Sequence, residues 1–320
     1  MDLVRLWKKR RTFDIYVPQN KISLRLNPFN IDNWISSLEE KIPTKICVIR
    51  DFDDFNGEEQ DRVIEHFQKN YNKILVCTES ISSLEPLGWG DYPKDYDRVI
   101  WVNESRPVPE NSKKEMYWPS YWYATIQFNS KINIKTLHNK NKIYPCSLRI
   151  KNQRQWKDKL LKKLNELSLL EKIKLAISHE NPYVKGSPFL FESENKNFNP
   201  NLPSLEQCQS FSIIMSETNN ITLTEKTWQV FWHDVPIFFH AGPAIEKLKQ
   251  YGLEIEFEGM KINYSQTDVT DQLVQVLQKT IENIEEIYHI NRKRCQHNFK
   301  VISDISQINK IFEPIFLNKL

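Results

Sequence analysis

The stretch from residue 211 to residue 243 constrains the fold of this chain more than any other part of it. Its sequence, FSIIMSETNNITLTEKTWQVFWHDVPIFFHAGP, runs from an apolar segment through a polar loop and an amphipathic segment to a second apolar segment at 235–239. That order predicts a strand, a loop, a helix and a second strand. Such a succession favours a right-handed crossover within a parallel sheet. The chain is therefore expected to be an α/β protein.

The first half of the chain repeats this alternation. Apolar runs at residues 45–49 and 73–77 predict buried strands on either side of a helix at 58–70. A third strand is predicted at 97–102. Cys47 and Cys77 fall inside these apolar runs, where a thiol behaves as a small hydrophobic group.

A second α/β unit is predicted to begin near residue 142. Its expected elements are strands at 143–148 and 172–178, and helices at 153–170, 243–251 and 269–290. The sequence thus predicts two α/β lobes, residues 1–140 and 141–300, with a binding cleft between them. The remaining residues, 301–320, have helical spacing and are expected to pack back on the body.

Composition excludes several classes of protein. The 44 Lys and Arg residues nearly balance the 41 Asp and Glu residues, which argues against a nucleic-acid coat protein. No GxGxxG or GxxxxGK[ST] motif is present, so a Gly-rich phosphate loop is not expected. Five scattered cysteines fit a reducing compartment. Without a signal peptide or an apolar run of about 18 residues, the chain is expected to be cytoplasmic and to lack a membrane span.

The polar loop after Glu217 carries the residues of greatest chemical interest. Thr222 and Glu225 form a capping box, and Trp228 begins the apolar face of the following helix, so these have structural explanations. Lys226 does not, because a cation in the first turn of a helix opposes the helix dipole. A bound diphosphate would reverse that penalty. Glu217, at the end of a strand, can accept hydrogen bonds from sugar hydroxyl groups.

These residues resemble the donor-binding signature of the α-1,3-fucosyltransferase family. The similarity rests on Glu217, on Thr224-Glu225-Lys226 and on Val235-Pro236-Ile237. The segment Tyr144-Pro-Cys-Ser-Leu-Arg149, with the helix after it, is similar to the family's Asn-Arg strand end, although Leu148 replaces the asparagine. The resemblance covers roughly residues 142–260, and the first 140 residues carry no matching motif.

The resemblance implies two Rossmann-like lobes of the GT-B type and an inverting transfer from a nucleotide-diphosphate sugar, with GDP-fucose as the candidate donor. It implies neither a cofactor nor an essential metal. Lys226 and Arg149 would neutralise the diphosphate, with Arg154 as the candidate for a further arginine. Glu225 would hold the ribose, and Glu217 would contact the donor sugar. The remaining donor-binding candidates are loop residues: Thr218, Asn219 and Thr224.

An inverting transfer also needs a general base on the acceptor side. Acidic residues near predicted strand ends supply the candidates, with Asp51 and Glu79 placed first, followed by Asp53, Asp54 and Glu104. Asp51-Phe-Asp53 also imitates the DxD metal motif of the other glycosyltransferase fold. His233 and His240 lack metal-ligand spacing and are interpreted as loop or cap residues.

The expected function is therefore a glycosyltransferase that acts on a glycan or another hydroxyl acceptor. An alternative is a glycosyltransferase that modifies a hydroxylated nucleic-acid base, since basic clusters occur at 8–11, 157–163 and 291–294; nucleic acid is the less favoured partner. A second alternative is a non-catalytic module that binds a nucleotide sugar or glycan. The aromatic residues at 118–123 can be interpreted as a stacking platform or as core.

Overall fold

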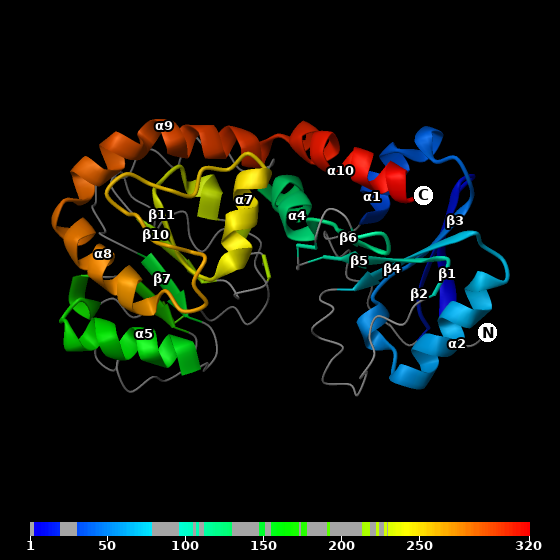
Figure 1. Ribbon diagram of the computed structural model, residues 1–320, viewed down its shortest axis with the longest axis horizontal. Coiled ribbons are helices and arrows are strands. Elements are labelled where there is room, and N and C mark those ends of the chain that lie inside the picture. Colours follow the sequence, from blue (N-terminus) through cyan, green and yellow to red (C-terminus); the bar gives the residue numbers. More distant parts are fainter. Residues whose placement is uncertain are drawn as a thin grey trace. The chain divides into compact units, whose positions relative to one another are not determined.

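The computed structural model describes residues 3–19, 31–78, 96–104, 107–108, 112–129, 147–150, 155–172, 174–177, 191–192, 213–217, 222–223, 227–228 and 230–320. The chain divides into two units, each built around its own sheet (Figure 1). Unit 1 comprises Met1–Ala124 together with Ser306–Leu320, and unit 2 comprises Thr125–Ile305. The predicted α/β class is confirmed. No helix in the described part of the chain is long and apolar enough to cross a membrane.

Unit 1 contains a six-stranded sheet whose strands follow chain order: β1 (Val4–Lys9), β2 (Phe13–Pro18), β3 (Ile46–Ile49), β4 (Lys73–Thr78), β5 (Val99–Asn103) and β6 (Glu115–Tyr117). Strands β2 to β6 run parallel, and β1 pairs antiparallel with β2 at the edge. Strands β3, β4 and β5 confirm the three predicted strands. The β1–β2 hairpin was not predicted.

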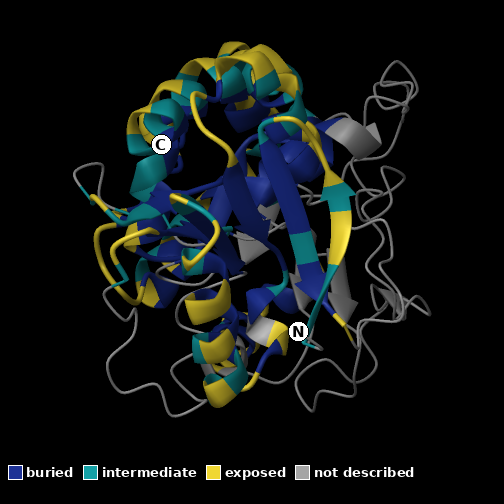
Figure 2. Ribbon diagram, turned by 90° about the vertical axis from the view of Figure 1, so that its right-hand side faces the viewer, coloured by how far each residue is buried: buried dark blue, intermediate teal, exposed yellow. Residues whose placement is uncertain are grey.

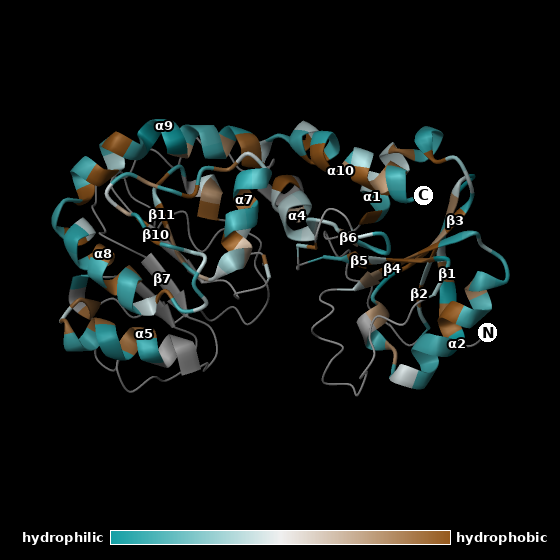
Figure 3. Ribbon diagram, viewed as in Figure 1, coloured by the Kyte–Doolittle hydropathy of each residue, from teal (hydrophilic) through white to brown (hydrophobic). Residues whose placement is uncertain are grey.

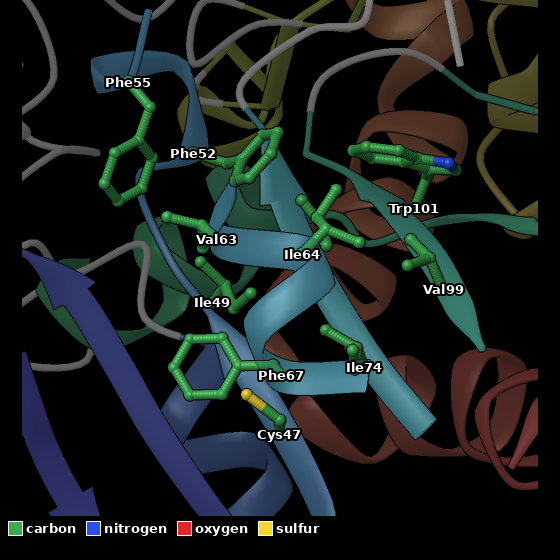
Figure 4. Packing of buried hydrophobic residues seen from close by; sticks show 11 residues of the cluster. Cys47, Ile49, Phe52, Phe55, Val63, Ile64, Phe67, Ile74, Val99 and Trp101 are labelled. Atoms are coloured by element: carbon green, nitrogen blue, oxygen red, sulfur yellow. The ribbon is translucent and has the colours of Figure 1, made fainter. Parts of the chain in front are cut away.

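Apolar packing against α2 (Gly57–Gln68) forms one side of the unit 1 core. Asn56 caps this helix through a reciprocal capping box with Glu59. Figure 4 shows three apolar side chains of the helix directed at the sheet: Val63, Ile64 and Phe67. The strands that they cover are apolar, and β4 and β5 are brown in Figure 3. Parallel strands buried on both faces require this continuous apolar character.

The C-terminal helix α10 (Ile305–Lys319) packs on unit 1. Trp34 of α1 (Ile31–Ser37) donates a hydrogen bond to Asn309 (2.9 Å), and its ring lies 5.1 Å from the ring of Phe316. Lys41 pairs with Glu313 at 2.5 Å, and the Lys73 ammonium donates to the carbonyl of Lys319 at 2.8 Å. The last helix of the chain thus completes the core of the first unit.

Three aromatic residues of the segment 118–123, Trp118, Trp122 and Tyr123, are buried in this core, and Tyr121 is half-buried. Trp118 and Trp122 are fully buried, and the Trp118 ring stacks on Trp34 with centroids 4.2 Å apart. The segment leads into α4 (Ser120–Asn129), within which the division between the units falls. The core interpretation of these aromatic residues is therefore confirmed.

Unit 2 contains a five-stranded parallel sheet in the order β11-β10-β7-β8-β9. Its strands are β7 (Ser147–Ile150), β8 (Lys174–Ile177), β9 (Phe191–Glu192), β10 (Ile214–Glu217) and β11 (Ile237–His240). Strands β7 and β8 overlap the predicted strands at 143–148 and 172–178, of which residues 143–146, 173 and 178 lie outside the described part of the chain. Helix α5 (Gln155–Glu166) connects β7 to β8 and is shorter than predicted.

The predicted single helix at 269–290 is wrong. Helices α8 (Thr270–Glu282) and α9 (Ile284–Ser303) meet at Asn283, whose φ of −127° is not helical. Asparagine favours such breaks because its side chain competes for backbone hydrogen bonds, and Asn283 bonds the Lys279 carbonyl. The helix predicted at 243–251 is a 3₁₀ turn, η8 (Pro243–Glu246), continued by α7 (Lys247–Gln250), and Gly252 follows with φ +83°.

Four further short 3₁₀ helices complete the described elements: η1 (Glu39–Lys41), η2 (Phe52–Asp54), η5 (Leu170–Lys172) and η7 (Val230–His233).

Candidate functional site

The strand order of unit 2 reverses direction between β7 and β10. From β7 the chain moves outward through β8 to β9, and it then returns to the other side of β7 for β10 and β11. In an open parallel sheet, such a reversal leaves a crevice at the carboxyl ends of the two strands that flank it, because their connections leave toward opposite sides. The carboxyl ends of β7 and β10 are therefore the candidate site of unit 2.

Two residues predicted from the sequence lie at this reversal. Arg149 is the third of the four residues of β7, and Glu217 is the last residue of β10. The two strands pair in parallel from Ser147 with Ile214 onward, so Arg149 and Glu217 occupy the carboxyl halves of neighbouring strands. The other predicted residues lie outside the described part of the chain: Glu79, Arg154, Thr218, Asn219, Thr224, Glu225 and Lys226.

His240 stands beside Glu217 and was not predicted as part of a site. It is the last residue of β11, and its Cα is the register partner of Glu217. The imidazole is buried, and its Nε2 lies 2.9 Å from the hydroxyl oxygen of Thr270, at the start of α8. The sequence did carry a signal for this residue, because His240 ends an apolar run that is predicted to be a strand. Its place at the same sheet edge follows only from the pairing of β10 with β11.

The segment between β10 and β11 packs as its apolar residues predicted. Trp228, Phe231 and Trp232 are buried, and the Trp232 ring meets Phe299 of α9 edge-on at 5.5 Å. Thr222 is also buried. The described apolar residues of the segment therefore serve packing, and its charged residues Glu225 and Lys226 lie outside the described part of the chain.

Unit 1 carries its own polar carboxyl edge, beginning at Asp51. This residue follows β3 in the left-handed backbone region (φ 53°, ψ 41°) and precedes η2. A non-glycine residue in that region is strained, and such strain is concentrated at functional sites. Gln60 of α2 holds the next turn, since its side-chain amide donates to the carbonyls of Phe52 (3.2 Å) and Phe55 (2.9 Å). The Asp51 side chain is 16% exposed, and its Oδ2 atom is buried.

A buried ion pair lies directly behind Asp51. Arg50 donates to Asp32 of α1 at 3.2 Å, and both side chains are buried. The second guanidinium nitrogen of Arg50 lies 3.8 Å from the carboxylate of Asp51. Burial raises the pKa of Asp32, and the positive charge of Arg50 opposes that rise. Because Asp32 fixes the guanidinium, Arg50 supplies a positioned cation beside the Asp51 carboxylate.

Polar residues continue across the neighbouring strand ends. Thr78 ends β4 and Asn103 ends β5, and the two are register partners. They lie two residues after the core residues Val76 and Trp101, so they face the same side of the sheet as α2. Both are buried, and the Thr78 hydroxyl has no hydrogen-bond partner in the described part of the chain. A buried hydroxyl without a partner is unfavourable unless a ligand or water completes it.

The DxD interpretation gains no support from the described residues. Asp51 begins a 3₁₀ turn, and no group of three His, Cys, Asp or Glu side chains within the described ranges could hold a metal ion together. Glu104, another candidate base, follows β5, and its backbone N–H donates to the Thr78 carbonyl at 3.0 Å. Asp51 and Glu104 therefore belong to the same edge of the unit 1 sheet.

Comparison with known proteins adds no relative: no family model, no curated protein and no solved structure matches this chain.

Proposed function

We propose that this protein is a glycosyltransferase that uses a nucleotide-diphosphate sugar, with the donor bound at the carboxyl ends of β7 and β10. The reversal of strand order between these strands carries the proposal, because Arg149 and Glu217 lie at that point. The sequence supports it independently through the Thr224-Glu225-Lys226 segment that follows Glu217. A two-lobed GT-B arrangement is part of the proposal, supported by two units that each hold a largely parallel sheet.

The proposed reaction is a single displacement. The oxygen of an acceptor hydroxyl attacks the anomeric carbon of the donor, and the bond from that carbon to the β-phosphate oxygen breaks. The nucleoside diphosphate leaves with the electron pair, so its negative charge grows in the transition state. Fixed positive charge stabilises that growth, which is the role proposed for Arg149 and Lys226. The acceptor hydroxyl loses its proton to a base.

We assign the base to Asp51. Its side chain is 16% exposed and lies two residues after β3, Arg50 lies beside it, and Gln60 holds the turn that follows it. A guanidinium nitrogen of Arg50 lies 3.8 Å from this carboxylate.

A ligand screen tests the donor assignment. The free energy of unfolding rises by about 2.7 kcal/mol when a ligand that binds only the native state is present at a hundred times its Kd. Thermal unfolding should therefore shift upward with one nucleoside diphosphate and its sugar derivative, and not with the matching monophosphate. Failure of every nucleotide and nucleotide sugar to shift the unfolding curve would contradict the proposed function. Hydrolysis of the donor without acceptor would exclude a non-catalytic binding module.

Asp51→Gly is expected to stabilise the protein and to lower its transfer rate. Glycine adopts the left-handed region freely, so the change should raise the free energy of unfolding by about 1 kcal/mol. Loss of the base should lower the transfer rate by about 10²–10⁴-fold. Ser168→Gly is the matched control, because Ser168 has the same φ of 53°. It should gain similar stability while transfer is unchanged. A full transfer rate in Asp51→Gly would exclude Asp51 as the base.

A further inference from the structure

The outer edge of the unit 1 sheet exposes two large apolar side chains beside a group of cations. In β1, Leu6 is 48% exposed and Trp7 is 44% exposed. The exposed residues Lys9, Arg10 and Arg11 follow at the end of the strand and in the turn to β2. These five residues are called the β1 patch. Figure 2 shows the outer strand in teal and yellow beside dark-blue inner strands.

A β-bulge produces the adjacent apolar pair. Leu6 pairs with Tyr16 and Lys8 pairs with Ile15, so Trp7 is an extra residue on the bulged strand. A bulge breaks the alternation of faces and re-aims a side chain. Leu6 and Trp7 are consequently both in solvent, where strict alternation would turn one of them toward the interior. Protection of a sheet edge accounts for a bulge and for cations, but it does not require two exposed apolar side chains.

The cations of the patch make no side-chain ion pair with the described residues. Lys8 is directed inward, since its ammonium donates to Ser36 at 2.9 Å and lies over the Phe13 ring. By contrast, within the described ranges no carboxylate pairs with the side chain of Lys9, Arg10 or Arg11. The nearest carboxylate contact is to backbone, where Glu39 accepts the Arg11 N–H at 3.0 Å. Among the described residues, these three cations are therefore available to an external anion.

We propose that the β1 patch docks this protein on membrane surfaces that contain anionic lipids. Tryptophan and leucine beside lysine and arginine match the boundary between headgroups and acyl chains, because the apolar groups enter it while the cations remain at the phosphates. An aliphatic leucine contributes nothing to stacking on nucleic-acid bases, so a lipid surface fits the patch better than a nucleic acid. This docking is independent of the proposed transferase activity.

Sedimentation of the full chain with vesicles tests the proposal. Binding is expected to vesicles of phosphatidylcholine with phosphatidylglycerol, and it should be weak with phosphatidylcholine alone and fall with added salt. Changing Lys9, Arg10 and Arg11 to glutamine should weaken binding by about fivefold per cation, or roughly a hundredfold in total. Leu6→Ser with Trp7→Ser should weaken it by about tenfold or more.

Matched variants control for charge and for exposed apolar area. Lys279, Lys293 and Lys300 are also exposed, and their change to glutamine removes the same net charge from unit 2. Leu167→Ser removes an apolar side chain that is 44% exposed on another surface. Both controls should bind vesicles like the wild type. Brominated lipid should quench the wild-type fluorescence, and Trp7→Phe should abolish most of that quenching.

Three outcomes would overturn the proposal. The first is equal binding to vesicles with and without anionic lipid. The second is undiminished binding of the β1 patch variants while their thermal unfolding is unchanged. The third is binding of a DNA duplex without binding of anionic vesicles, which would assign the patch to nucleic acid.

Discussion

Arg149→Ala is expected to lower the rate of sugar transfer by about 10²–10³-fold, the loss typical when one fixed group that stabilises transition-state charge is removed. Arg149 lies in β7 at the strand reversal of unit 2, where the diphosphate is proposed to bind. Diphosphate affinity should fall as well, so the upward shift of thermal unfolding by the nucleoside diphosphate should shrink. Steady-state transfer rates and the unfolding midpoint with and without nucleotide measure both effects.

Arg292→Ala is the control for this prediction. Arg292 is exposed on α9 of the same unit and packs over the ring of Tyr288 at 5.9 Å. Its loss removes one guanidinium from unit 2 without touching the carboxyl edge of the sheet, so transfer and nucleotide binding should be unchanged. Equal transfer rates in Arg149→Ala and Arg292→Ala would show that the donor does not bind at β7.

Ending the chain after Ser303 is expected to unfold unit 1 and to leave unit 2 folded. The missing residues include α10, whose Phe312 and Phe316 pack against Tyr117, Trp118 and Trp34. Without that helix, the aromatic side chains that it covers would be exposed to water. Hydrogen exchange followed by mass spectrometry should show rapid exchange in β3, β4 and β5. Amides of β10, β11 and α8 should remain protected.

A single substitution in α10 is expected to weaken unit 1 without unfolding it completely. Phe316→Ala should lower the free energy of unfolding of unit 1 by about 3–5 kcal/mol, the range for removing a buried aromatic side chain. Ile305→Ala, at the 38% exposed start of the same helix, should cost much less. If both substitutions lowered the free energy of unfolding by a similar amount, the packing of Phe316 would not be what stabilises unit 1.

Strands with unbroken apolar runs were predictable, because burial on both faces demands such runs. Residues 45–49 and 73–77 are therefore read correctly from the sequence. The β1–β2 hairpin was missed because Leu6 and Trp7 are exposed in β1, so the strand lacks the usual alternation. The break at Asn283 was missed because apolar spacing on both sides of it remains helical.

The sequence predicted individual residues of the candidate site, but it did not predict that they lie together. Glu217 and Arg149 stand out locally because each is a charged residue in or closing an apolar run. Their meeting at one reversal of strand order is non-local, since it depends on β10 pairing with β7 and not with β9. The left-handed backbone of Asp51 could not be predicted from local sequence either, and the turn after it is held by Gln60 from the next helix.

The return of α10 to unit 1 also sets the order in which the protein can be made. Domains generally fold as units during synthesis, with the N-terminal one first. Here Ser306–Leu320 leaves the ribosome after all of unit 2, yet Trp34 and Lys73 need it as a partner. Unit 2 is therefore complete before unit 1 is. Until α10 has emerged, the nascent chain exposes the tryptophans that α10 will cover, and chaperones that bind exposed apolar segments can act during that interval.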